Sequence, residues 1–133
     1  FEKSELIFDK VIIAKGKNDT KNINIDEYNR ELNNLIDLYP TKEIISYSGL
    51  LTNLINEQTG NITLIRGLRN GYDLDAENTM ITYMKDMLPE LKVVYIPCDK
   101  KYEHISSSAI RSIRIHGDEL IEKYLPKKKL NVV

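Results

Sequence analysis

Short apolar runs that alternate with helical patterns constrain the fold more than any other feature of this chain. Four runs rich in isoleucine and valine, at residues 11–14, 43–47, 62–65 and 93–96, are each ended by glycine, serine, arginine or proline. Such runs are typical of central strands buried on both faces. Apolar residues recur at helical spacing after each of the first three runs. The alternation predicts an α/β fold with a parallel sheet flanked by helices, in which ligands bind beyond the carboxyl ends of the strands.

Charge and composition exclude several classes of protein. The chain has 133 residues, with 19 lysines and arginines against 20 aspartates and glutamates, and a net charge of −1. It therefore has no global positive field to attract nucleic acid or an anionic membrane, and no apolar stretch reaches the roughly 20 residues that span a bilayer. The single cysteine, Cys98, cannot form an internal disulfide. We expect one domain over residues 1–133, cytoplasmic, without a signal peptide and without nucleic-acid or membrane partners.

Two arginines follow the third predicted strand. Arg66 and Arg69 carry planar forks of N–H donors that pair with phosphate oxygens, and Gly67 between them leaves the backbone open to a ligand. Lys17 and Lys21 follow the first strand. Taken singly, such cations are more often solvated surface residues, but their coincidence at one edge of a sheet favours a phosphate site.

A serine-rich turn follows the fourth predicted strand. Ser106, Ser107 and Ser108 open a helical pattern, and Arg111 lies one turn further. Hydroxyl groups and exposed helix N–H groups can together bind anionic oxygens. The alternative is a redundant helix cap. Together with the arginines, this turn predicts a nucleotide-binding protein.

The stretch at residues 72–77 is acidic and opens the next helix. The interpretation we favour is charge that stabilises the positive end of that helix. In the other interpretation, one carboxylate meets a ribose, an amine or a cationic partner.

Four segments in the same order resemble the bacterial pantetheine-phosphate adenylyltransferases of the nucleotidyltransferase superfamily. They are residues 8–14, the Ser-Gly-Leu-Leu sequence at 48–51, Ile-Arg-Gly-Leu-Arg at 65–69 and Ile-Ser-Ser-Ser at 105–108. The resemblance covers nearly the whole chain and implies a Rossmann-like nucleotidyltransferase fold. It also implies adenylyl transfer from ATP to 4'-phosphopantetheine, giving dephospho-coenzyme A and pyrophosphate in coenzyme A biosynthesis. Mg²⁺ as cofactor, no metal ligand among the side chains, and a homo-oligomer, a hexamer by analogy, are further implications.

Matching positions carry the family's roles onto this chain. The catalytic candidates are Lys21, Arg69 and Ser107. Lys21 and Arg66 would hold the phosphate of phosphopantetheine, and Leu51 would line its pantetheine arm. The residues that would face ATP are Gly67, Leu68, Arg69, Glu77, Tyr102, Glu103, His104, Ile105, Ser106, Ser107, Ser108 and Arg111.

The family's first strand and its Thr/His-x-Gly-His motif would lie before Phe1, so the resemblance implies an N-terminally incomplete domain. A parallel sheet without that strand should have a long unpaired edge or a groove between neighbouring strands. The histidines present, His104 and His116, have no such motif around them. We expect the His104 ring to pack beside the adenine pocket instead of acting in catalysis.

Two further departures leave alternatives open. Tyr28 stands where the family usually has arginine, which suggests a changed subunit contact, and Met84 stands at a position that is often polar near the pantetheine. The phosphate acceptor could therefore be another molecule, such as nicotinamide mononucleotide, for an adenylyltransferase or cytidylyltransferase. A non-catalytic nucleotide-binding remnant is the third reading.

Overall fold

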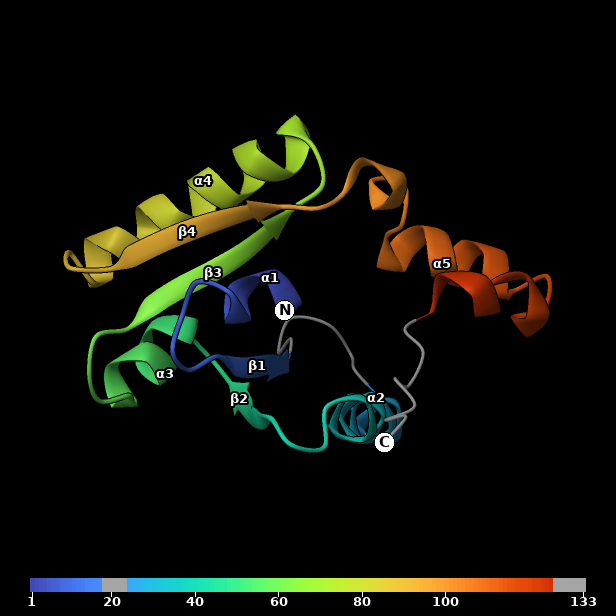
Figure 1. The fold of residues 1–133 in the computed structure, drawn as a ribbon, viewed down its shortest axis with the longest axis horizontal. Coiled ribbons are helices and arrows are strands. Elements are labelled where there is room, and N and C mark those ends of the chain that lie inside the picture. The colour runs from blue at the N-terminus through green and yellow to red at the C-terminus, as the bar shows by residue number, and fades with distance from the viewer. Residues whose placement is uncertain (18–23, 126–133) are drawn as a thin grey trace.

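The computed structural model describes residues 1–17 and 24–125. Helices and strands alternate along these residues (Figure 1). In chain order they are α1 (Glu2–Glu5), β1 (Ile12–Lys17), α2 (Ile25–Leu38), β2 (Glu43–Ser48), α3 (Leu51–Glu57), β3 (Thr63–Leu68), α4 (Gly71–Met87), β4 (Lys92–Pro97) and α5 (Ser107–Arg114), with short 3₁₀ turns at Lys100–Tyr102, Asp118–Leu120 and Glu122–Tyr124. The predicted α/β fold is confirmed.

The strands form two parallel pairs. β1 pairs with β2 from Ile12 opposite Glu43, and β3 pairs with β4 from Thr63 opposite Lys92. The structure therefore divides the expected sheet into two halves, each of two strands. Because parallel strands within a pair run the same way, the residues that follow β3 and β4 emerge at one end of their half. The arginines at the end of β3 and the serine turn after β4, which together make up the predicted phosphate site, therefore lie toward the same end of this strand pair.

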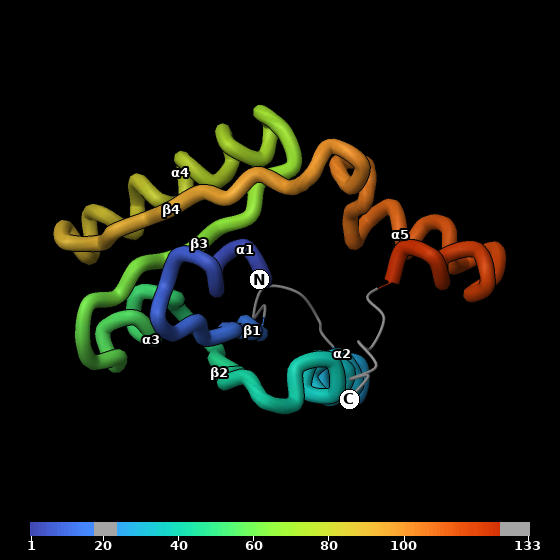
Figure 2. The backbone as a smooth tube through the Cα atoms, viewed as in Figure 1, coloured from blue at the N-terminus to red at the C-terminus, as the bar shows by residue number. Residues whose placement is uncertain are grey.

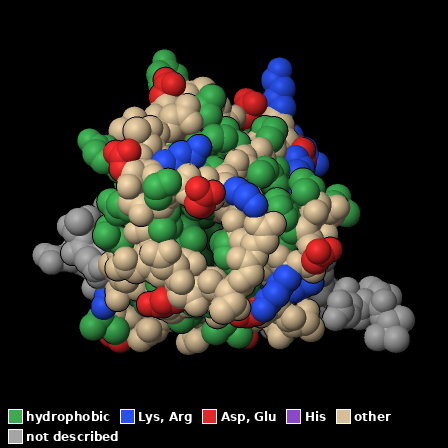
Figure 3. Space-filling model, turned by 90° about the vertical axis from the view of Figure 1, so that its left-hand side faces the viewer, with side chains coloured by type: hydrophobic (Ala, Val, Ile, Leu, Met, Phe, Trp, Pro, Cys, Tyr) green, Lys and Arg blue, Asp and Glu red, His purple; other side chains and the backbone are tan. Residues whose placement is uncertain are grey.

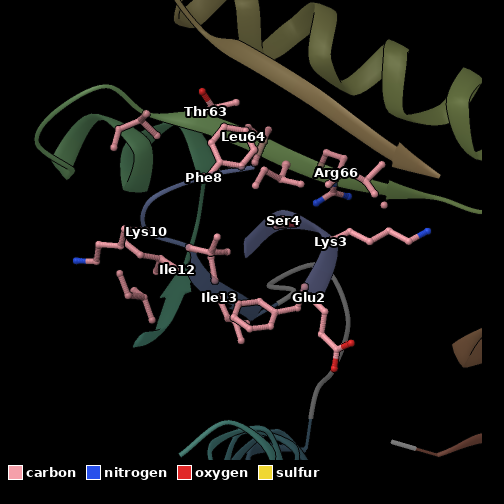
Figure 4. A pocket seen from close by; sticks show the side chains of 18 of the residues that line it. Glu2, Lys3, Ser4, Phe8, Lys10, Ile12, Ile13, Thr63, Leu64 and Arg66 are labelled. Carbon is pink, nitrogen blue, oxygen red and sulfur yellow. The ribbon is translucent and has the colours of Figure 1, made fainter. Parts of the chain in front are cut away.

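A groove separates the two pairs. It has a volume of about 830 Å³ and is lined by successive residues of β1 (Ile12 and Ile13) and of β3 (Thr63 and Leu64). A cavity over one face of a strand touches every second residue, so contact with successive residues means that the groove runs along strand edges. Figure 4 looks into it, with β3 on one side and α1 and β1 on the other. The groove expected between neighbouring strands is present.

The hydrophobic core lies under α4. Ile81, Met84 and Leu91 are buried together, and apolar side chains from α3, β3 and β4 pack against them. Met84 is therefore a core residue, although it also borders a smaller cavity. Figure 2 shows that the segment after β4, which includes α5, extends to one side of the strand pairs. No helix in the described ranges has the length and apolar character needed to cross a bilayer.

Tyr28 joins α2 to the first strand pair. Its side chain is buried, and its hydroxyl lies 3.1 Å from the Lys15 carbonyl oxygen and 2.5 Å from Ser46 Oγ. A phenol has one proton, so when it donates to the carbonyl, the serine hydroxyl donates to it. Tyr28 thus lies inside the fold of its own chain. The changed subunit contact that tyrosine in place of arginine suggests stays a prediction.

Candidate active site

Arg66, on β3, forms a two-point ion pair with Glu77 of α4. Arg66 Nε and Nη2 donate to the two carboxylate oxygens, each at 2.7 Å. The Glu77 side chain is 20% exposed and that of Arg66 42%. The hydrogen bonds that Arg66 donates to Glu77 raise the pKa of Arg66, against the opposing effect of burial. The guanidinium is therefore held charged and oriented, with its Nη1 side free of Glu77.

Arg69 forms a second ion pair of the same kind, with Asp73. Its Nε and Nη2 donate to the Asp73 carboxylate at 2.9 and 3.0 Å. These bonds raise the pKa of Arg69 and lower the pKa of Asp73. Arg69 Nη1 also donates to the Ile105 carbonyl at 3.5 Å, a long contact, which places the guanidinium beside the loop that leads into α5. Arg69 and the serine turn, predicted separately, thus lie near each other.

The serine turn has distinct roles for its members. Ser106 is the N-cap of α5, because its Oγ accepts the Ala109 N–H at 3.2 Å. Ser106 Oγ also lies 3.2 Å from Ser108 Oγ. Within the described ranges the hydroxyl of Ser107 has no hydrogen-bond partner, so the capping alternative applies to Ser106 and leaves Ser107 available to a ligand.

Two cavities meet at Arg66. A smaller one of about 310 Å³ is bordered by Leu51, Arg66, Glu77 and methionine side chains of α4. The large groove is bordered by Arg66, Gly67 and Tyr102. The predicted pantetheine residue, Leu51, and the predicted phosphate residue, Arg66, both border each of the two cavities, and the smaller one adds the methionine side chains. An apolar body with a cation at one end suits an amphipathic ligand that carries an anionic group.

The remaining candidates are less constrained by the structure. Lys21 lies outside the described residues. The His104 ring packs edge-on against Tyr124, with centroids 5.9 Å apart, and its place beside an adenine stays a prediction.

Glu103 and Arg111 are exposed. Leu68 lies at the end of β3, where its carbonyl accepts the Cys98 N–H at 2.7 Å. In the described part of the chain, no three His, Cys, Asp or Glu side chains are grouped so as to hold a metal ion.

Sequence reasoning did not single out Asp73. The interpretation favoured for the acidic stretch at 72–77 holds for Asp73, which lies in the first turn of α4. The other interpretation, a carboxylate that meets a cationic partner, holds as well, because Asp73 and Glu77 pair with arginines. The Arg-x-x-x-Asp spacing across a helix start was an available signal, since residues four apart are neighbours on a helix. The separation of eleven residues between Arg66 and Glu77 carries no such signal.

The fold and this site define a class: an α/β domain of nucleotidyltransferase type, with paired arginines at one strand end and a serine-capped helix after the next. No family model matches the chain. Curated relatives do, each named phosphopantetheine adenylyltransferase. The one from Buchnera aphidicola (strain Tuc7) is 35% identical over 92% of this chain and 74% of its own length. The one from Porphyromonas gingivalis is 33% identical over 95% of this chain and 82% of its own length. The one from Bordetella petrii is 30% identical over 90% of this chain and 71% of its own length.

The chain belongs to the phosphopantetheine adenylyltransferase family.

Proposed function

We propose that this protein transfers the adenylyl group of ATP to 4'-phosphopantetheine, giving dephospho-coenzyme A and pyrophosphate in coenzyme A biosynthesis. The observation that carries the proposal is the pair of oriented arginines near the end of β3, one bordering an apolar cavity and the other beside the serine turn. Two anionic substrates need two such cationic positions close together. The names of the relatives support the same reaction.

The acceptor is assigned to the Arg66 side. Phosphopantetheine has a phosphate at one end and a long, mostly apolar arm, which matches a cavity bordered by Arg66, Leu51 and methionines. Methionine side chains adapt well to a flexible ligand. The Nη1 side of Arg66, which Glu77 leaves open, can donate to the phosphate. Lys21 is assigned to the same phosphate by family analogy.

ATP is assigned to the Arg69 side. Arg69, the Ser107 hydroxyl and the backbone around Gly67 and Leu68 would bind the triphosphate, and the segment 102–108 would surround the nucleotide. Arg111 is included by family analogy. Glu77 is included on the same ground, although its carboxylate pairs with Arg66 and borders the cavity assigned to the acceptor. A phosphate oxygen of the acceptor attacks the α-phosphorus, the bond to the β,γ-pyrophosphate breaks, and no covalent enzyme intermediate forms. The residues act by positioning both substrates and by offsetting charge on the phosphate oxygens.

Mg²⁺ is proposed as the cofactor, entering with ATP. Magnesium is usually held through substrate phosphates with few protein ligands. The described residues offer no grouped set of ligands, so no side chain is assigned to it and no step is derived through it.

A cytoplasmic location and a homo-oligomer, with six subunits by family analogy, are part of the same proposal. Exposed apolar side chains outside the two cavities support association: Leu6, Ile25, Tyr72 and Ile115 are 60–88% exposed. Figure 3 shows hydrophobic side chains among charged ones on the face where α3 and the end of α4 lie.

Parallel turnover assays test the proposal. The purified protein is given ATP and Mg²⁺ with either 4'-phosphopantetheine or nicotinamide mononucleotide, and both products are measured. We expect dephospho-coenzyme A and pyrophosphate in equal amounts with the first acceptor. A preference for the nicotinamide substrate, or nucleotide binding without pyrophosphate release, would reject it.

A further inference from the structure

Asp73 is an acidic residue that contacts the candidate site and has no role assigned to it so far. Its carboxylate accepts three hydrogen bonds from one residue: the Arg69 backbone N–H at 2.9 Å, Nε at 2.9 Å and Nη2 at 3.0 Å. The first two end on Oδ2 and the third on Oδ1. Both the main chain and the side chain of Arg69 are therefore fixed by one carboxylate.

The carboxylate is itself held in place by the start of α4. Asn70 caps the helix, and its Oδ1 accepts the Asp73 N–H at 3.0 Å. Asp73 lies in the first turn, where the positive end of the helix dipole favours a negative charge. The Asp73 side chain is only 22% exposed. It is therefore a rigid partner for an arginine that is itself 39% exposed.

The contacts leave a defined part of Arg69 for a ligand. Asp73 occupies Nε and one hydrogen of Nη2, and the Ile105 carbonyl takes one hydrogen of Nη1. The donors that remain belong to the two terminal nitrogens, since a guanidinium carries two hydrogens on each. They lie on the side of the guanidinium away from Asp73. By fixing the Nε side of the Arg69 guanidinium, Asp73 thus determines the direction in which the free N–H groups of Nη1 and Nη2 point.

Arg66 has the same arrangement with Glu77, which accepts from Nε and Nη2. The two carboxylates come from successive turns of α4, because residues 73 and 77 are four apart. One helix therefore orients both arginines near the end of β3.

We propose that Asp73 is a positioning residue for ATP, acting through Arg69; this rests on the function proposed above. The carboxylate holds the guanidinium so that its terminal N–H groups face the triphosphate, and it does not touch the nucleotide itself. Its loss should weaken ATP binding because a freely rotating arginine must be ordered when the nucleotide binds.

Asp73→Asn is the informative variant. The amide has the shape of the carboxylate, and its oxygen can still accept the backbone N–H and Nε of Arg69. Its NH₂ group would face the Nη2–H of Arg69, and because both groups are donors they cannot form a hydrogen bond. The variant therefore loses the Nη2 hydrogen bond with little other change. Asp75→Asn is the matched control, since Asp75 is an exposed aspartate of the same helix and no role is assigned to it.

Steady-state kinetics with both substrates varied, and calorimetry with ATP alone, provide the readout. We expect Asp73→Asn to raise the ATP KM and Kd about tenfold. The KM for phosphopantetheine should change less than about twofold, and Asp75→Asn should match wild type. In an Arg69→Ala background, Asp73→Asn should have no further effect on ATP, since its partner is gone.

Several outcomes would overturn the proposal. They are an unchanged ATP affinity in Asp73→Asn, an equal loss for both substrates, an equal loss in the Arg69→Ala background, and a variant that does not fold, which would assign the carboxylate a structural role. The proposed function fails separately, if wild type makes no dephospho-coenzyme A. ATP calorimetry would still test Asp73 in that case.

Discussion

Arg66 and Glu77 connect β3 to α4 through two parallel hydrogen bonds of 2.7 Å at the point where two cavities meet. A two-point arginine–carboxylate pair fixes the plane of the guanidinium as well as its position. An arriving phosphate does not have to displace Glu77, because the Nη1 side of Arg66 is not engaged by it. The pair thus orients a cation between the two proposed substrates before either of them binds.

The serine turn offers a test that separates function from capping. Ser107→Ala should lower turnover about tenfold and leave the melting temperature unchanged, since the Ser107 hydroxyl serves only the ligand in the proposed site. Ser106→Ala removes the N-cap of α5 and should cost about 1 kcal/mol of stability. Turnover and thermal unfolding of both variants check this. A lower melting temperature with full activity in Ser107→Ala would assign that hydroxyl to the helix cap.

Stability should fall in acid through two aspartates. Arg69 lowers the pKa of Asp73, and Lys3 lowers the pKa of Asp99. A carboxyl with a lowered folded-state pKa binds fewer protons in the folded than in the unfolded state. Its contribution is therefore present above the ordinary aspartate pKa of about 3.9 and is lost as the pH falls through the lowered value.

Urea unfolding between pH 6 and pH 2 measures this effect. We expect the urea midpoint of wild type to drop below about pH 4, and that of the double variant Asp73→Asn, Asp99→Asn to drop less. Parallel curves for the two proteins would show that neither ion pair contributes.

Local patterns in the sequence determine much of this fold. The apolar runs became strands, and Asn24 caps α2 as its position before an amphipathic pattern predicts. Such features depend on neighbours in the chain, which a sequence displays directly. The partners of Arg66 and His104 depend on how elements pack, and the sequence does not display packing. Arg66 was expected to hold the acceptor phosphate together with Lys21, and the sequence did not indicate that Glu77 of the next helix pairs with it.

Tyr28→Phe should destabilise the protein by about 1–3 kcal/mol. The phenol hydroxyl is buried and satisfies both the Lys15 carbonyl and Ser46 Oγ, so its removal leaves polar atoms without a partner. Chemical denaturation of Tyr28→Phe, Ser46→Ala and the double variant checks this. Losses that simply add would show that the two hydroxyl groups do not act together.

Hydrogen exchange should alternate along β1 and β3. Each strand is paired along one edge within the described ranges, and successive amides of a strand point to opposite edges. Amides in the ladders should exchange slowly, and those that face the groove should exchange faster. Residue-resolved exchange by NMR provides the test. Uniform protection along either strand would mean that its groove edge is also covered.

The central claim is that Arg66 serves the acceptor and Arg69 serves ATP. The most direct measurement is the steady-state kinetics of Arg66→Ala and Arg69→Ala with both substrates varied. We expect Arg66→Ala to raise mainly the KM for phosphopantetheine, and Arg69→Ala to raise mainly the KM for ATP. Each increase should correspond to a loss of about 1.5–3 kcal/mol of binding free energy. Kinetics in which both variants match wild type, or in which the two preferences are exchanged, would contradict the assignment.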